Sequence, residues 1–435
     1  MSQPQDQACI IIIGLPAASL CGIDLLSFTP SPRFHGIKQV PPGWHFLFTG
    51  STNSLSIRHG EWLYVGSRST SNDALTSRDS GSQTLDVHIR QWNTSTESLE
   101  ALNDAEAVQQ WRNRLSSIWN EGLTPYRQTV TSGEEASNST ATPEGTQDWR
   151  QLTNCITPGL LDRITCSGPG GSQESSGPSD WSLTSASSAA RDMDDIPGLS
   201  NAESATRQLE EKELAFLPID LKQTWRTGAV GRERTDAAKD RSWALGDILA
   251  TQQQTSGSRE EAEANLLGEM QLTFLMVLTL ANYSCLEQWK RILGLLLTCR
   301  AAIKERSGLF AKALLLLTLQ LRHYGDVEGG LFDLSDEGGQ MLKDLLKGFR
   351  RTLEDVWDEA KGESLKASEA VDEVRDAFEE VEAFVKTELG WELSDSFVRR
   401  GMLELEDGEQ VEMEVNDLEG EDERGEYAPV IVDLG

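Results

Sequence analysis

The longest apolar stretch of the chain runs from Leu266 to Ile303, and polar residues interrupt it near its middle. Its longest run without a strongly polar residue, 272–281, is about half the length that a helix needs to cross a bilayer. Asn282 ends this run, and charged residues follow. The pattern therefore predicts two helices joined near 281–284. The first is apolar almost all round and should lie at the centre of a helical domain, and the second has a one-sided apolar stripe.

Apolar residues at helical spacing continue on both sides of this pair. A recurrence at three and four residues is typical of amphipathic helices that pack on a common core. The spacing predicts further helices over 240–251, 309–324, 341–357 and 364–389. Together these segments predict an α-helical domain over 213–398.

The first third of the chain has a different pattern, with short runs of β-branched and aromatic residues between clusters of Gly, Pro, Ser and Asn. Such runs are typical of strands separated by turns. We expect strands over 9–13, 44–48, 62–65 and 85–92. A helix should begin after Asp104 as its N-cap, and a short helix should cover 149–156. The prediction is a β-rich domain over 8–165 and an α+β fold overall.

Three polar segments interrupt this organisation. Residues 128–147 contain almost no large apolar side chain and predict a disordered insertion. Residues 167–212 are rich in Ser, Gly, Pro and Asp up to Ser204, and they predict a disordered linker between the domains. Residues 401–435 form an acidic tail, with twelve acidic residues against one basic residue between Leu403 and Tyr427. Such a run is normally solvated and disordered.

The tail ends in a short β-prone peptide after Pro429. In an extended conformation Val430, Val432 and Leu434 would share one face, with Ile431 on the other. We expect this peptide to add a strand to the exposed sheet edge of a partner protein. The alternative, a frayed terminus without a partner, remains open.

Charge restricts the class of partner. The chain of 435 residues has 39 basic and 70 acidic residues and a net charge of -31. This balance argues against a nucleic-acid-binding protein, because phosphate contacts need Lys and Arg. The six cysteines are scattered and form no C-x-x-C pair. We therefore expect reduced thiols, no secretory signal, and a location in the cytoplasm and nucleus.

Signatures of catalysis are poor. The sequence has no P-loop, no G-x-G-x-x-G and no G-x-S-x-G. His45 lies in an aromatic run, which favours a core or turn-bonding histidine over a base or ligand. Glu269 and Glu287 are more consistent with capping or interhelical pairing than with a carboxylate pair. We predict a protein that is not an enzyme, with no cofactor and no metal, and keep a hydrolase using His45 or His88 as a remote alternative.

One motif stands out in the N-terminal part, Arg33–Phe46, with the sequence RFHGIKQVPPGWHF. Its Pro-Pro-Gly segment predicts a rigid turn, because proline presets φ and glycine accepts a positive φ. The turn leads directly into a strand and presents the residues around it at a defined angle. As partner-binding residues we predict Lys38, Pro41, Pro42 and Trp44, together with Val430, Ile431, Val432 and Leu434 of the tail.

These residues resemble a known family. The matching segments occur in order over residues 10–310: GLP at 14–16, GID at 22–24, GIKQVPPGWHF at 36–46, WRQLTN at 149–154, DRSWAL at 240–245, LGEMQ at 267–271 and EQWKR at 287–291. They are similar to segments of the cistron-splicing-factor (AAR-two) family, the assembly factors of the U5 small nuclear ribonucleoprotein. The insertions and the acidic tail depart from the compact family pattern.

The resemblance implies a β-rich N-terminal domain and an α-helical, VHS-like C-terminal domain. It also implies a non-enzymatic assembly factor in pre-mRNA splicing. Such a factor binds the large U5 scaffold protein through its RNase-H-like and MPN-type domains, and withholds it from the helicase until maturation. Family members are thought to use a C-terminal tail in binding. No direct contact with nucleic acid or membrane is expected. The alternative is a VHS-like helical adaptor in protein trafficking, which has no reason to carry the GIKQVPPGWHF or DRSW segments.

Overall fold

The N-terminal strands form two five-stranded sheets. The first sheet is mixed and has the order β8-β7-β1-β4-β9, and the second is antiparallel and has the order β10-β6-β5-β2-β3. The first sheet contains β1 (Ala8–Ile13), β4 (Gly36–Val40), β7 (Asp86–Asn93), β8 (Ser98–Ala101) and β9 (Leu123–Pro125). The second contains β2 (Leu20–Ile23), β3 (Leu26–Phe28), β5 (Gly43–Gly50), β6 (Arg58–Val65) and β10 (Ser182–Thr184).

The computed structural model describes residues 8–52, 57–66, 86–126, 144–165, 181–189, 192, 213–327, 331, 338–362, 365–393, 400–404 and 410–414. Residues 1–381 form one compact unit, and residues 382–435 form a second. Within the described ranges, no helix combines the length and the apolar character that a membrane crossing requires.

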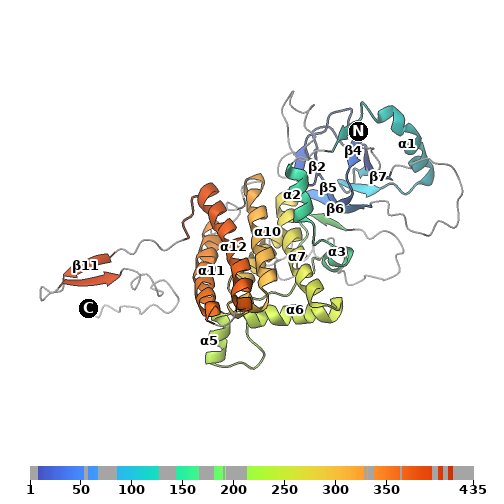
Figure 1. The fold of residues 1–435 in the computed structure, drawn as a ribbon. Helices are drawn as coiled ribbons and strands as arrows, with labels where there is room; N and C mark the ends of the chain where they lie inside the picture. Colours follow the sequence, from blue (N-terminus) through green and yellow to red (C-terminus); the bar gives the residue numbers. More distant parts are fainter. Residues whose placement is uncertain are drawn as a thin grey trace, which may run out of the picture. The chain divides into compact units, whose positions relative to one another are not determined.

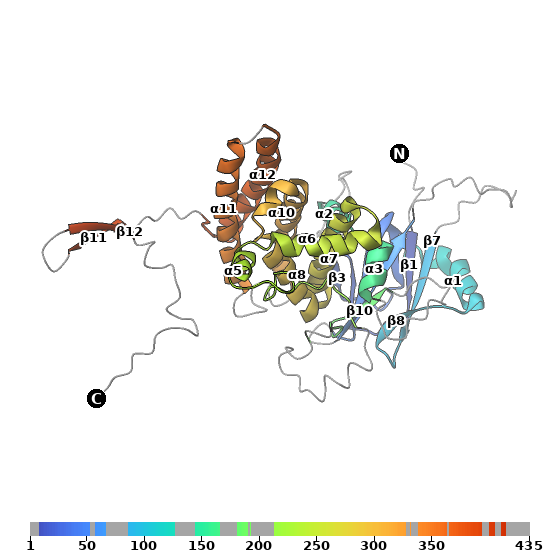
Figure 2. The same cartoon turned by 90° about the horizontal axis from the view of Figure 1, so that it is seen from below.

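The all-apolar sequence of β1 follows from its position in the first sheet. Ile10 and Ile12 pack with Leu47 and Leu63 of the second sheet, whereas Cys9 and Ile11 pack on the opposite face. There they meet α1 (Ala105–Ile118), which covers the outer face of the first sheet (Figure 2). Because successive side chains of a strand alternate between faces, a strand buried on both sides has no polar position.

The helical region follows the strands in the sequence, and in Figure 1 its helix α7, drawn in yellow, is nearer to the blue strands than α10 and the orange α11. Two short helices, α2 (Glu144–Leu152) and α3 (Pro158–Thr165), precede it. It contains α5 (Arg232–Lys239), α6 (Ser242–Ser256), α7 (Arg259–Leu280), α8 (Tyr283–Leu296), α9 (Ala301–Glu305), α10 (Ser307–Arg322), the 3₁₀ helix η3 (Tyr324–Asp326), α11 (Gly338–Lys361) and α12 (Leu365–Glu388). The predicted order, a β-rich N-terminal region followed by a helical region, is confirmed.

The central helix pair has the predicted form. Every residue of α7 from Leu266 to Leu280 is buried, and α7 packs against α6, α8 and α10. Ala281 ends α7 in the left-handed conformation, with a φ of 53°. Asn282 then caps α8, because its side chain accepts a hydrogen bond from the Cys285 N–H at 2.8 Å.

The structure corrects the prediction for part of the linker 167–212. Residues 182–184 form β10, which extends the second sheet along β6, and Leu183 is buried. Asn282 Nδ2 donates to the carbonyl oxygens of Thr184 and Ser187 at 3.0 and 2.7 Å. The buried Leu183 and the paired backbone groups are enough to hold this serine-rich segment in place. The prediction of disorder rested on the average composition of the segment, which does not detect such single contacts. Most of the remaining linker, and residues 128–143 of the predicted insertion, lie outside the described residues. The last residues of the predicted insertion, 144–147, belong to α2.

The acidic tail also contains structure that its composition does not predict. β11 (Arg400–Glu404) and β12 (Gln410–Glu414) form an antiparallel hairpin. Leu403 lies opposite Val411, and Gly401 lies opposite Met413. Apolar residues alternate with glutamates along the sequence of β12, a pattern typical of a strand. The rest of the tail, including its last peptide, lies outside the described residues.

Candidate partner-binding site

The chain passes from the first sheet to the second between β4 and β5, at the Pro-Pro-Gly segment for which a rigid turn was predicted. Gln39 has no opposite residue in β1, has a φ of 64°, and forms a β-bulge. Bulges bend a strand and increase its twist. Gly43 has a φ of 135°, which glycine adopts at little cost. Residues 39–43, called the corner below, therefore turn the chain from one sheet into the other.

The structure brings together three of the four predicted N-terminal site residues. Pro41, Pro42 and Trp44 are half-buried and line one pocket. Lys38 lies elsewhere, at the end of α1: its Nζ donates to the Trp119 carbonyl at 2.6 Å and lies 5.4 Å from the centroid of the Trp119 ring. The predicted tail residues lie outside the described residues: Val430, Ile431, Val432 and Leu434.

A buried polar network supports the corner from below. Asp24 is fully buried and accepts hydrogen bonds from the Phe46 N–H at 2.8 Å and the Tyr126 hydroxyl at 2.5 Å. His45 is buried as well, with Nδ1 2.7 Å from Asp24 Oδ2 and Nε2 2.7 Å from the Pro41 carbonyl. Both neighbours are hydrogen-bond acceptors, so the protonated imidazole satisfies both contacts. Its links to Pro41 and Asp24 confirm His45 as a turn-bonding residue.

The surroundings of His45 raise its pKa. Burial by itself lowers the pKa of the imidazole, but the charge of Asp24 and the hydrogen bonds to Asp24 and Pro41 together outweigh that effect. Burial and the nearby Asp24 carboxylate also raise the pKa of the Tyr126 hydroxyl. The network therefore favours the protonated form of His45 beside the Asp24 carboxyl group at the base of the corner.

The first prediction is a pH dependence of stability. Because the pKa of His45 is higher in the folded than in the unfolded protein, its stabilising contribution is complete below about pH 6.5 and is lost as the pH rises through the folded-state value. His45→Gln should cost about 1–3 kcal/mol at pH 6 and should flatten the decline above pH 6.5 in urea denaturation. The control is His59→Gln. Burial lowers the pKa of His59, so this histidine should reduce stability as the pH falls below 6.5, and His59→Gln should remove that decline. Parallel wild-type and His45→Gln profiles above pH 6.5 would contradict the assignment.

The pocket beside the corner, called the aromatic pocket below, has a volume of about 280 Å³. Its walls come from the corner, from β5 and β6, and from α2. Trp149 of α2 is buried, stacks on Trp62 with ring centroids 5.9 Å apart, and donates its indole N–H to the Trp44 carbonyl at 2.7 Å. The residues that line the pocket are Pro41, Pro42, Gly43, Trp44, His45, Tyr64, Tyr126, Thr146, Trp149, Arg150, Thr153, Asn154 and Ile156.

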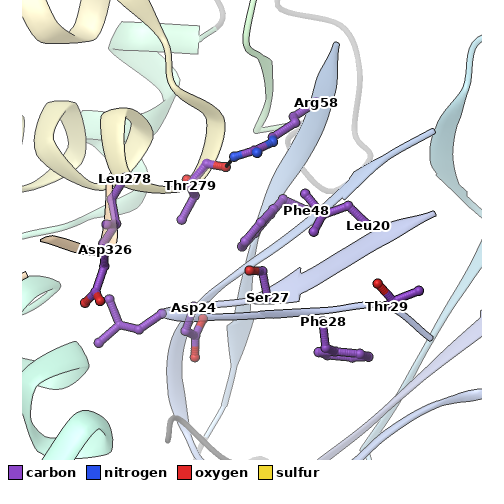
Figure 3. A pocket seen from close by; sticks show the side chains of 11 residues that line it. Leu20, Asp24, Ser27, Phe28, Thr29, Phe48, Arg58, Leu278, Thr279 and Asp326 are labelled. Carbon is purple, nitrogen blue, oxygen red and sulfur yellow. Dashed lines mark hydrogen bonds between the residues drawn. The ribbon is translucent and has the colours of Figure 1, made fainter. Parts of the chain in front are cut away.

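A second pocket, of about 470 Å³, lies where the second sheet meets the end of α7 and η3 (Figure 3). In it Arg58 Nη1 donates to the Thr279 carbonyl at 3.0 Å. The last carbonyl groups of a helix have no helical partner, so Arg58 satisfies one of them from the sheet. Asp326 lies on the opposite wall and is 2.9 Å from His323 Nδ1. This pocket marks a junction between the β-rich and helical regions.

His45 and His88 are the two histidines of the hydrolase alternative. A general base needs a nitrogen that is available to take a proton, and both ring nitrogens of His45 face oxygen atoms of the network. Burial lowers the pKa of His88, whose Nε2 lies 3.4 Å from Asp86 Oδ2. Among the described residues, no three or more His, Cys, Asp and Glu side chains are grouped to hold a metal ion.

Comparison with known proteins assigns both regions. The family described as AAR2 N-terminal domain matches residues 6–166, and the family described as AAR2 C-terminal repeat region matches residues 216–394. The chain belongs to the AAR2 family. It is 27% identical to the Protein AAR2 homolog of Mus musculus over 332 residues, which cover 75% of this chain and 77% of the relative. The homologs of Homo sapiens and Caenorhabditis elegans are 25% and 23% identical, over 75% and 72% of this chain and 77% and 78% of their own lengths.

The AAR2-like segments meet at the junction of the two regions. On α7, Gln271 donates to the Gln151 carbonyl at 2.9 Å and to Asn154 Oδ1 at 2.7 Å, and it accepts from the Cys155 N–H at 2.9 Å. One turn earlier, Gly268 lies against the Cys155 carbonyl. The WRQLTN segment thus docks on the LGEMQ segment of α7.

Glu269 of the same AAR2-like segment is fully buried and pairs between elements, as the sequence predicted. It accepts hydrogen bonds from Arg163 Nη2 at 2.6 Å, from the Leu217 N–H at 2.9 Å and from Gln288 Nε2 at 2.7 Å. Glu287 instead pairs with Lys290 one turn away on α8, with Lys290 Nζ 3.0 Å from Glu287 Oε1. The two glutamates therefore have separate structural roles.

The remaining AAR2-like segments organise the helical region. Asp240 accepts hydrogen bonds from the Ser242 N–H and from the Arg300 and Ala301 N–H groups, so it satisfies the first backbone N–H of both α6 and α9. Trp289 of the EQWKR segment donates its indole N–H to Gln320 Oε1 at 2.9 Å. Arg291 forms an ion pair with Asp192.

Proposed function

We propose that this AAR2-family protein is a non-enzymatic assembly factor in pre-mRNA splicing. It binds the large scaffold protein of the U5 snRNP, through the RNase-H-like and MPN-type domains of that scaffold, and withholds it from the helicase until the particle matures. It acts in the cytoplasm and nucleus. The observation that carries the proposal is the match of both regions of the chain, residues 6–166 and 216–394, to AAR2 families.

The structure supports a binding role in two ways. Trp44 and Pro42 are partly exposed in the aromatic pocket together with Tyr64, which is 54% exposed, so apolar surface is available to a partner. The β-rich and helical regions are bonded to each other through α7, so they present one continuous surface. In a trafficking adaptor built on the helical region alone, the hydrogen bonds from Gln271 to Asn154 and from Asn282 to Ser187 would have no purpose.

The experiment is affinity purification of the tagged full-length chain followed by mass spectrometry, with recovery of the U5 scaffold as the expected result. Recovery of trafficking proteins without U5 components would reject the proposal.

The second prediction concerns the tail. We compare two variants with the full chain: one ends at Gly425, and the other is Val432→Pro, which lacks the backbone N–H needed for a strand hydrogen bond. Both should bind the purified scaffold domains at least about tenfold more weakly than the full chain. Val432→Ala keeps the N–H and serves as the matched control. Equal binding by the truncated and full chains would reject strand addition by the tail, while the result of the purification would still stand.

A further inference from the structure

We infer that the aromatic pocket beside the corner binds an extended segment of a partner protein in which proline lies next to acidic residues. The inference rests on the proposed function only in treating the corner as a partner-binding surface. Beyond the proposed function, it specifies which residue types the bound segment contains.

The wall of the pocket is ordered before any partner binds. The Trp44 ring meets Tyr64, Trp181 and Trp62 edge to face, with centroid separations of 5.0, 5.3 and 6.5 Å. Its backbone carbonyl is held by Trp149. Trp44 is nevertheless only half-buried, and Tyr64 is 54% exposed. A rigid, exposed aromatic pair loses little conformational entropy when a ligand packs against it.

Charge defines which ligand fits. The residues that line the aromatic pocket include Arg150 but no Asp or Glu, in a chain with 70 acidic and 39 basic residues, and the lining residue His45 lies against the buried carboxyl group of Asp24. Arg150 is exposed on the last turn of α2, and its charge reaches the floor of the pocket, where it opposes the rise in the pKa of both His45 and Tyr126. Aromatic pockets often take cations, but a guanidinium at the rim repels them. The same guanidinium favours a carboxylate.

The backbone of the pocket favours a polyproline II segment over an added strand. Pro41 and Pro42 have no N–H to donate, and the carbonyls of Pro41 and Trp44 already accept hydrogen bonds from His45 and Trp149. A β-strand would find few unpaired backbone groups here. Polyproline II segments need no such partners, because they dock through proline rings on aromatic-lined grooves. The volume of about 280 Å³ lies just below the range for small-molecule sites and suits one or two residues.

The test is fluorescence anisotropy with the full-length protein and a fluorescein-labelled peptide, Glu-Glu-Pro-Pro-Leu-Pro-Glu-Glu. Two comparison peptides replace all prolines with alanine or all glutamates with lysine. The acidic proline peptide should bind at least about tenfold more tightly than either comparison peptide. The assay contains no U5 protein, so its outcome and that of the scaffold purification are independent.

Two substitutions test the location. Tyr64→Ala and Arg150→Glu should each weaken binding about tenfold or more, and both residues are exposed, so folding should be preserved. The matched controls are Trp243→Ala, 47% exposed on α6, and Arg232→Glu on α5, whose guanidinium is 93% exposed; each should change binding less than about twofold. The inference is overturned if the acidic proline peptide binds no better than the alanine peptide, or if Tyr64→Ala and Arg150→Glu bind it like the wild type.

Discussion

Replacing Glu269 with alanine should lower the free energy of unfolding by about 3 kcal/mol or more. The carboxylate is fully buried on α7 and accepts hydrogen bonds from α3, from the segment that leads into the helical region, and from α8. Its removal takes away the carboxylate to which the Leu217 N–H and Gln288 Nε2 donate in the interior, although Gln288 Nε2 keeps its hydrogen bond to the Leu217 carbonyl at 3.1 Å. The Arg163 side chain is 25% exposed and reaches water, so the loss should lie at the lower end of the range for a broken buried pair.

Glu287→Ala provides the matched control on the neighbouring helix. Its side chain is 26% exposed and pairs with Lys290 at i,i+3, so its loss should cost less than about 0.5 kcal/mol. Urea denaturation at pH 7 gives both values, and the Glu269 variant should also lose hydrogen-exchange protection at the Leu217 amide. Equal losses for the two variants would show that the Glu269 network does not hold the regions together.

The elements predicted correctly are those whose burial can be read from neighbouring residues, as an unbroken apolar run or as apolar residues at helical spacing. The apolar run of α7 and the five apolar residues of 9–13 leave no solvent-facing position, so the pattern alone identifies them. β2, β3 and β4 are short, and glycine in β2 and β4 interrupts any alternation. β2 pairs with β5 and β4 pairs with β1, strands that lie elsewhere in the sequence, and β3 joins the sheet only through β2. β10 depends on β6 in the same way.

The candidate site was only partly predictable for the same reason. The rigidity of Pro41–Pro42 and its position before Trp44 are properties of the local sequence, and the structure places those residues together. Tyr64 and Arg150 join them from β6 and α2, through packing that the sequence does not display. For Lys38, the contact with Trp119 removes it from the site, because a cation near the end of a helix finds carbonyl and ring acceptors there.

Gly268→Ala and Gly348→Ala should change stability in opposite directions, although both place alanine in the interior of a helix. Alanine has a better helix propensity than glycine by about 1 kcal/mol. At Gly348 on α11 a Cβ atom meets nothing within 4 Å, so the variant should gain about 0.5–1 kcal/mol. At Gly268 on α7 the Cβ atom would lie 2.5 Å from the Cys155 carbonyl oxygen and 2.8 Å from Leu160 Cδ2.

The Cys155 backbone has little room to move, because its N–H donates to Gln271 Oε1 at 2.9 Å. Gly268→Ala must therefore separate the WRQLTN segment from α7 and should cost about 2–3 kcal/mol, as overpacking of a core does. Urea midpoints at constant m-value measure both changes, and hydrogen exchange at the Cys155 amide should rise in the Gly268 variant alone. A neutral Gly268→Ala would mean that α7 and the β-rich region are not held in close contact. With the predicted loss, Gly268 and Gln271 hold the WRQLTN segment against α7, and the neighbouring Glu269 bonds Arg163 of α3, so α7 joins the two AAR2 regions.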